Sequence, residues 1–325
     1  NAAVSDAKQN HSTPKGTHAV IVDGAALTAI FDDLHTDLRK KFLLLCKNCK
    51  SVLCCRVSPS QKAQVVRATK ELFKVMTLAI GDGANDVAMI QAANIGVGIA
   101  GEEGRQAVMS SDYGVGQFRF LTRLVLVHGR WSYKRLAEMI PCFFYKNVVF
   151  TLTLFWYGIY VNFDGTYLLE FTLIMFYNLA FTSLPIIFLA VLDQDVSDTV
   201  SLLTPELYIS GILGLEWSQF KFIFYMLDGV YQSVISFYFP YLLYYTGTFV
   251  NSQGLILIHR FWMGTMVASI SVISCNIYVL LQQKRWDWLS GIIYAFSVLI
   301  IFFWIGVWSS STYSGEFYKA AAQVY

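Results

Sequence analysis

The sequence is 325 residues long; 55% of its residues are hydrophobic and only 14% are charged. A soluble globular protein carries roughly 25% charged residues, so this composition excludes a wholly soluble protein. The low polarity, with 6 prolines and 6 cysteines in so long a chain, also excludes a disordered chain, a collagen and a small disulfide-rich scaffold.

The charges are divided unevenly along the chain. Residues 1–140 hold 18 Lys and Arg and 12 Asp and Glu, whereas residues 141–325 hold 6 and 10. The two segments therefore have net charges of +6 and −4, which sum to the +2 of the whole chain. This pattern predicts a water-soluble segment followed by a membrane segment, and it gives no reason to expect a nucleic-acid partner.

The first 127 residues alternate short apolar runs with helical stretches. Because the apolar runs are continuous, they predict parallel strands covered on both faces. After a linker at 1–18, the alternation of strand and helix predicts a doubly wound α/β domain at 19–127. The predicted strands are Ala19–Val22, Ser51–Arg56, Lys74–Ile80 and Ile95–Ile99, and the predicted helices are Gln61–Phe73, which Ser60 precedes, and Asp86–Ala93.

Lys62 lies in the first turn of the helix that follows the second predicted strand, at the end of the sequence Arg-Val-Ser-Pro-Ser-Gln-Lys. The free N–H groups at the start of a helix favour an anion, and a lysine there gives a second reason to hold phosphate. The alternative is a solvated surface lysine. An acid-rich loop farther along the chain disfavours that alternative.

This acid-rich loop, Gly-Asp-Gly-Ala-Asn-Asp at 81–86, follows the third predicted strand. In doubly wound sheets the chemistry lies at the carboxyl ends of strands. Asp82 and Asp86 are four residues apart, so a turn that enters a helix brings both carboxylates to one hard cation such as Mg²⁺, while Asn85 offers an amide to a phosphate oxygen. The alternative is a turn that only caps a helix, but such a turn does not require both acids.

Two other motifs are interpreted as structural. Residues 96–101 match the dinucleotide fingerprint G-x-G-x-x-G, but its glycines should open a helix and here they fall within a predicted strand. Cys46 and Cys49, followed by Cys54 and Cys55, lack the spacing of common zinc ligands. We expect reduced cysteines that pack in the core.

Five apolar stretches in the second half are long enough to cross a hydrocarbon core of about 30 Å, which needs about 20 helical residues. The Lys and Arg residues between them concentrate on one side, which the positive-inside rule makes cytosolic. Residues 1–139, including a connector at 128–139, are therefore expected in the cytosol, and residues 311–325 on the exoplasmic side. The membrane domain at 140–310 has predicted spans at about 140–161, 168–192, 220–245, 255–281 and 288–308.

A few polar side chains lie within these spans. Lys146 lies near the start of the first span, beside Asn147; a charge within a membrane costs about 2.5–3.5 kcal/mol and is functional by default. The alternative is a lysine that snorkels to the interface. Asn178 and Thr182 are four residues apart and should share one helix face ahead of the helix-breaking Pro185, either at a functional site or as polar contacts between helices.

These motifs together resemble those of P-type ATPases. The stretches 56–62 and 81–86 are similar to the phosphorylation domain of that superfamily, which has a HAD-like (Rossmann-type) α/β fold. The resemblance predicts a partial phosphorylation domain joined to an all-α polytopic membrane domain. The type IV branch, the phospholipid flippases, is indicated by 100–111, with Gly-Glu-Glu-Gly-Arg-Gln-Ala-Val, and by Phe-Tyr-Lys-Asn at 144–147 and Phe-Tyr-Asn-Leu at 176–179, and its fungal plasma-membrane or Golgi members by 128–141.

The resemblance implies a role for each of these residues. Asp82 and Asp86 would bind the Mg²⁺ that bridges to the transferred phosphate, with Asn85 completing the loop. Lys62 would neutralise charge on the phosphoryl group, and Arg56 would contact the nucleotide, ATP. The lipid path would include Lys146, Asn147, Asn178 and Thr182.

The implied activity is an ATP-driven phospholipid flippase, located in the plasma membrane or in trans-Golgi and endosomal membranes. It would move lipid from the exoplasmic to the cytosolic leaflet while the γ-phosphoryl group of ATP passes to an aspartate and is then hydrolysed. That aspartate belongs to an Asp-Lys-Thr-Gly-Thr motif which this chain lacks, so we expect the C-terminal part of a longer pump, without its last span. A glycosylated β-subunit with two spans is also implied, docking at exoplasmic loops such as 162–166 and 247–253.

A cation-transporting P-type ATPase is the alternative in another substrate class. Such pumps carry carboxylates in these spans, because hard cations need oxygen ligands. The second span has no Asp or Glu between Phe171 and Leu189, and Asp228 in the third span is a lone acid. A non-enzymatic membrane scaffold is a third interpretation, which the intact Lys62, Asp82 and Asp86 disfavour.

Overall fold

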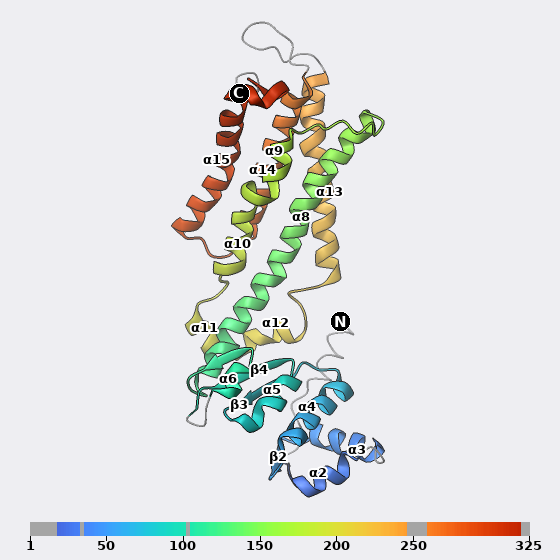
Figure 1. Ribbon diagram of the computed structural model, residues 1–325, viewed down its shortest axis with the longest axis vertical. Coiled ribbons are helices and arrows are strands. Elements are labelled where there is room, and N and C mark those ends of the chain that lie inside the picture. Colours follow the sequence, from blue (N-terminus) through green and yellow to red (C-terminus); the bar gives the residue numbers. More distant parts are fainter. Residues whose placement is uncertain (1–17, 33–35, 102–104, 246–258, 320–325) are drawn as a thin grey trace. The chain divides into compact units, whose positions relative to one another are not determined.

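The computed structural model describes residues 18–32, 36–101, 105–245 and 259–319. The chain divides into two compact units, Asn1–Val125 and Leu126–Tyr325. In Figure 1 the first unit combines short strands with helices, and the described part of the second is helical. Nearly all of the predicted linker, and the predicted exoplasmic loop at 247–253, lie outside the described residues.

Among the described residues of the first unit, five parallel strands form two sheets. The strand β1 (Ala19–Asp23) pairs with β2 (Ser51–Cys55), while β3 (Leu78–Gly81), β4 (Ile95–Ile99) and β5 (Tyr113–Val115) pair in that order. All four predicted strands are present, although β3 begins later than predicted. The strand β5 is too short to have given a recognisable apolar pattern.

Within the described chain these strands form two separate parallel sheets, so the doubly wound domain stays a prediction. The first two strands are also less covered than predicted, since Ile21 is 72% exposed and Leu53 is 57% exposed. An apolar run indicates that a strand can be buried. A strand is buried only where other elements cover both faces of its sheet, and the described residues cover these faces only in part.

Local capping sets the start of the main helix of this unit, α4 (Pro59–Phe73). Ser58 is its N-cap: the Ser58 hydroxyl accepts from the Gln61 N–H at 3.3 Å, and the Ser58 N–H donates to Gln61 Oε1 at 2.9 Å. This capping box, with Pro59 at the first helical position, starts the helix earlier than predicted. The other helices of the unit are α2 (Gly24–Ile30), α3 (Thr36–Lys47), the 3₁₀ turn η2 (Ala84–Asp86), α5 (Val87–Ala92), α6 (Gln106–Met109) and α7 (Phe120–Arg123).

The glycines of the dinucleotide-like motif lie within β4, as predicted. A Cβ atom at Gly98 would lie 2.6 Å from Val108 Cα, and one at Gly96 would lie 2.5 Å from Ile90 Cγ2. These glycines therefore allow α5 and α6 to pack directly on the strand. They hold no nucleotide loop in this structure.

Long helices form the second unit (Figure 1). The helix α8 (Arg130–Tyr160) packs against α10 (Ser183–Leu192), α13 (Gln219–Tyr245) and α14 (Arg260–Gln282). The helix α15 (Trp288–Ser310) packs against α10 and α14. The core of the second unit is rich in aromatic contacts, such as the stacked rings of Phe150 and Tyr177, whose centroids are 3.8 Å apart. The elements are the π-helical η3 (Leu124–Gly129), α8 (Arg130–Tyr160), α9 (Phe171–Phe176), the π-helical η4 (Tyr177–Phe181), α10 (Ser183–Leu192), α11 (Asp198–Leu203), η5 (Pro205–Tyr208), α12 (Ile209–Ile212), α13 (Gln219–Tyr245), α14 (Arg260–Gln282), α15 (Trp288–Ser310) and η6 (Thr312–Phe317).

Four helices in the described ranges are long and apolar enough to cross a membrane by length and composition. The predicted span at 220–245 also forms one helix, α13, but it is not among these four. Its sequence includes Lys221, Asp228 and a series of tyrosines, which lower its hydropathy. A crossing by α13 therefore stays a prediction. The four helices are Phe120–Tyr160, Phe171–Leu192, Arg260–Gln282 and Trp288–Ser310.

Candidate functional site

The acid-rich loop lies at the carboxyl end of β3. Gly81 ends the strand, and Gly83 caps the 3₁₀ turn η2 that leads into α5. A Cβ atom at Gly81 would lie 2.3 Å from the Cβ atom of Asp86. Glycine at this position therefore allows the Asp86 side chain to fold back over the end of the strand.

Asp86 holds Lys62 at the end of this strand. The Lys62 Nζ atom donates to Asp86 Oδ1 at 2.7 Å, and the Asp82 N–H donates weakly to Asp86 Oδ2 at 3.4 Å. The two stretches that the sequence identified, 24 positions apart, are thus joined in space. Since both oxygens of Asp86 are engaged, its carboxylate orients Lys62 and the loop. Its role beside Asp82 in binding Mg²⁺ stays a prediction.

Asp82 and Asn85 are exposed on the outer side of the loop. Within the residues that the structure describes there is no group of three or more His, Cys, Asp or Glu side chains suited to hold a metal ion. An exposed carboxylate beside a partly buried one does fit Mg²⁺, which usually binds one or two protein carboxylates and completes its shell with water and phosphate oxygens. The acidic residues at 102–103 lie outside the described residues.

Arg56 directly follows β2, and its φ of 51° turns the chain there. Its carbonyl packs against Gly24 at the end of β1, since a Cβ atom on Gly24 would lie 2.5 Å from Arg56 O. Gln61 Nε2 donates to Gly24 O at 2.7 Å, so the ends of both strands meet the start of α4. Asp23 accepts from the Ala26 N–H at 2.8 Å and serves as the cap of α2.

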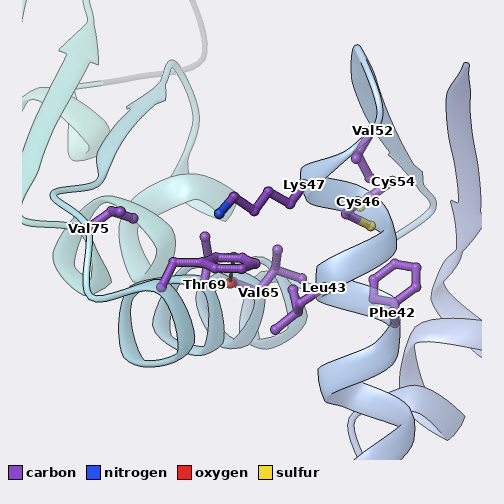
Figure 2. A pocket seen from close by; sticks show the side chains of 10 residues that line it. Phe42, Leu43, Cys46, Lys47, Val52, Cys54, Val65, Thr69 and Val75 are labelled. Carbon is purple, nitrogen blue, oxygen red and sulfur yellow. Dashed lines mark hydrogen bonds between the residues drawn. The ribbon is translucent and has the colours of Figure 1, made fainter. Parts of the chain in front are cut away.

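A cavity of about 680 Å³ is lined by residues of α3, β2 and α4 (Figure 2). Its lining is largely apolar, with Lys47 lying 5.4 Å from the ring centroid of Phe73. Cys46 and Cys54 also face it; burial raises the pKa of both thiols, and the neighbouring cysteines add to this. The cavity contains no residue of the acid-rich loop, and its thiols stay protonated near neutral pH.

Lys146 lies inside the helical unit and is only 2% exposed. Its Nζ atom donates to Thr182 Oγ1 at 3.0 Å and lies 5.4 Å from the ring centroid of Phe143. It therefore points into the bundle and does not snorkel toward an interface. None of the ion pairs found between described residues includes Lys146, so two of the three ammonium donors have no protein acceptor in that part of the chain.

Thr182 is positioned by a break in the helix that contains it. The π-helical segment η4 follows α9, and Thr182 has a φ of −129° before α10 begins. The Thr182 hydroxyl donates to Tyr177 O at 2.7 Å and accepts from Lys146. The Tyr177 hydroxyl in turn donates to Lys146 O at 2.8 Å, so the broken helix is bound to α8 at the level of this lysine.

Asn147 and Asn178 take no part in the hydrogen bonds that join Lys146, Thr182 and Tyr177. Asn147 Nδ2 donates to Phe143 O at 3.0 Å within its own helix, and Asn178 is exposed. The expectation that Asn178 and Thr182 share a face is wrong, because Thr182 is buried at 1% exposure. A π-helical turn holds more residues than an α-helical one, so a spacing of four no longer brings two side chains to the same face.

An ion-pair network that the sequence did not indicate lies near the start of α8. Asp195 Oδ2 accepts from Arg130 Nη1 at 2.6 Å and from Lys134 Nζ at 2.9 Å. Lys134 also pairs with Glu216 at 3.0 Å. These contacts join α8 to the connections after α10 and before α13, and no local spacing rule predicts pairs so far apart in sequence.

The lowered pKa of Asp195 predicts the response of this network to acid. Burial alone raises the pKa of Asp195, but hydrogen bonds from Lys134 and Arg130 outweigh burial and lower it. A carboxyl whose pKa is lower in the folded than in the unfolded chain stabilises the fold above its ordinary pKa of about 4, and that contribution is lost as the pH falls through the lowered value. Stability should therefore fall as the solution is acidified below about pH 4.

We expect Asp195→Asn to lower the free energy of unfolding at neutral pH by about 1.5–3 kcal/mol, because Arg130 loses a charged hydrogen-bond partner. The variant should also lose less stability than the wild type on acidification. Thermal unfolding in detergent between neutral and acidic pH measures both effects. Identical pH profiles for the two proteins would contradict this role of Asp195.

Comparisons with known proteins find sequence similarity in both units. The family model described as phospholipid-translocating P-type ATPase C-terminal matches residues 108–325. The chain is 65% identical over 321 residues to the phospholipid-transporting ATPase DNF1 of Saccharomyces cerevisiae, covering 98% of this chain and 20% of that protein. It is 43% identical over 292 residues to the phospholipid-transporting ATPase VA of Homo sapiens, covering 90% of this chain and 19% of that protein.

The chain therefore spans about a fifth of the length of the curated relatives that it matches. Its four apolar helices are those of a membrane protein, in agreement with this family. Because the family model covers most of the chain and relatives match nearly all of it, the chain belongs to the phospholipid-translocating P-type ATPases, within their C-terminal region.

Proposed function

We propose that the protein containing this chain is an ATP-driven flippase that moves phospholipid from the exoplasmic to the cytosolic leaflet. The observation that supports this most is the ammonium group of Lys146, buried within the helical unit without an acidic partner among the described residues. A buried cation with two free donors suits an anionic lipid phosphate. The remaining N-terminal part of the pump would supply the further domains and spans.

The first unit is proposed to be part of a HAD-like phosphorylation domain. Gln61 and Lys62 of α4 contact the end of β1 and the loop after β3, which brings the carboxyl ends of the two sheets to one helix terminus. A strand from the rest of the pump, pairing with both β1 and β3, would join the two sheets into one. It would also cover apolar residues such as Ile21, and its carboxyl end would place an aspartate beside Lys62.

The proposed reaction forms a bond between that aspartate and the γ-phosphorus of ATP and breaks the bond to ADP; water then hydrolyses the aspartyl phosphate. Lys62, held by Asp86, would neutralise charge on the phosphoryl oxygens. Asn85 would donate to a phosphate oxygen, and the exposed Arg56 would contact the nucleotide. Asp82, with Asp86 in support, would hold Mg²⁺, which when bound supplies positive charge to the phosphate.

The similarity to fungal relatives supports a location in the plasma membrane or in trans-Golgi and endosomal membranes, with residues 1–139 in the cytosol. The proposed lipid path includes Lys146, Asn147, Asn178 and Thr182, of which Lys146 and Thr182 are in direct contact. A glycosylated β-subunit with two spans is proposed to dock at the exoplasmic side. The connection at 162–166, where Thr166 Oγ1 donates to Asp164 at 2.7 Å, is the described loop on that side.

The decisive test is ATP hydrolysis by the complete pump, measured against a panel of phospholipids and of monovalent and divalent cations. We expect stimulation by at least one phospholipid and none by a cation alone. Stimulation by a cation without any response to lipid would contradict the flippase proposal and indicate a cation pump. The lone Asp228 of α13 already disfavours that alternative.

A further inference from the structure

Pro185 leaves one carbonyl of the broken helix without its usual partner. In a regular helix residue 185 would donate its N–H to the carbonyl of Phe181, but proline has no N–H. Phe181 is buried, so water does not satisfy this carbonyl. A donor from another helix is therefore needed.

Asn276 of α14 provides that donor. Its Nδ2 atom donates to Phe181 O at 2.9 Å, across 95 positions of sequence, and the residue is 1% exposed. Only the NH₂ group of the amide can satisfy a carbonyl, so this contact fixes the orientation of the side chain. The buried residues one turn away on α14, Val272 and Val279, are apolar.

The residue before Asn276 contacts the other end of the π-helical segment. The sulfur of Cys275 lies 3.3 Å from the hydroxyl of Tyr177, which donates to Lys146 O. Consecutive residues of α14 thus hold Tyr177 and Phe181, the first and last residues of η4. Thr182, the acceptor for the ammonium of Lys146, follows directly.

We infer that Asn276 is a positioning residue, which sets the place of the Lys146 ammonium by holding the helix break at Phe181. Without the amide, the Phe181 carbonyl must turn toward another donor. Its peptide unit leads directly into Thr182, so the hydroxyl that accepts from Lys146 turns with it. The inference rests on the proposed function, in which Lys146 contacts the lipid.

The test uses Asn276→Leu in the complete pump with its accessory subunit. We expect the phospholipid concentration for half-maximal ATPase stimulation to rise about tenfold, which corresponds to about 1.4 kcal/mol. Phosphorylation by ATP without lipid should stay unchanged. Ser271→Ala is the matched control, because Ser271 is equally buried on α14 but its hydroxyl donates to Val267 O of its own helix.

A second variant separates positioning from stability. In Pro185→Ala/Asn276→Leu the new N–H of residue 185 can donate to Phe181 O within the helix, which should restore protein yield. We expect its lipid requirement to stay high, because that hydrogen bond lies within the helix and does not hold the break to α14. A return to the wild-type lipid requirement would show that Asn276 acts only through folding and would overturn the inference. If Asn276→Leu alone does not accumulate, the double variant decides the question.

Lys146→Ala distinguishes failure of this inference from failure of the proposed function. If Lys146→Ala raises the lipid requirement and Asn276→Leu does not, the positioning role is wrong and the flippase proposal stands. If Lys146→Ala has no effect on lipid stimulation, the proposed lipid path itself is wrong. If both variants raise the lipid requirement, the combined variant Lys146→Ala/Asn276→Leu should require no more lipid than Lys146→Ala alone, since both changes act on one group.

Discussion

Asp82→Asn in the complete pump is expected to lower Mg²⁺-dependent phosphorylation by ATP by about 10³-fold. Asp82 is the exposed carboxylate of the loop after β3, whereas the carboxylate of Asp86 is already engaged by Lys62 at 2.7 Å. An asparagine keeps the size of the side chain and removes its charge. The loop should therefore keep its fold and lose the group that attracts a hard cation.

Incorporation of the γ-phosphate of labelled ATP, measured over a range of Mg²⁺ concentrations, tests this prediction. Asp37→Asn is the matched control, since Asp37 is an exposed aspartate in the first turn of α3 and belongs to the same unit. Its phosphorylation should equal that of the wild type. If Asp82→Asn keeps full activity at low Mg²⁺, Asp82 has no part in the site.

Lys146→Ala is expected to raise the lipid concentration needed for half-maximal stimulation about 10- to 100-fold, the range of one hydrogen bond to a charged group. Phosphorylation by ATP should be preserved, because the variant removes no residue of the first unit. Lipid-stimulated dephosphorylation should be impaired accordingly. The effect should be larger than that of Thr182→Val, which removes the acceptor but leaves the charge.

Decay of the phosphorylated pump with and without phospholipid measures this effect. Thr153→Val is the matched control: Thr153 is also buried on α8, and its hydroxyl donates to Phe150 O of its own helix at 2.6 Å. It should keep the wild-type response. Unchanged lipid stimulation in Lys146→Ala would leave this lysine a purely structural role in the bundle.

Local features of the chain could be read directly from the sequence. Four strands and the main helices were predicted near their observed positions, because apolar runs and capping residues act over a few positions. The boundaries of α4 and β3 differ from prediction by a few residues, as the cap at Ser58 shows. The glycines of β4 were correctly assigned to a strand, since the dinucleotide motif requires them in a loop.

The candidate site was predicted less completely. The sequence pattern alone identified Lys62 and Asp86 as site residues, but it did not show that Lys62 donates a hydrogen bond to Asp86. It placed Asn178 with Thr182, which the π-helical segment separates, and it missed Asn276 entirely. The signal for Asn276 is indirect: Pro185 shows that a carbonyl lacks a donor, but it does not show which helix provides one.

The sequence by itself determined that a charged α/β segment precedes apolar helices, and which residues carry charge into those helices. These properties depend on composition and on local spacing, which the chain fixes before it folds. Only the tertiary structure decided that Lys146 faces Thr182, that Asn276 holds the break, and that Asp195 joins Arg130 to Lys134. Such contacts join residues far apart in the chain, and they follow from helix packing and from the need of every buried polar group for a partner.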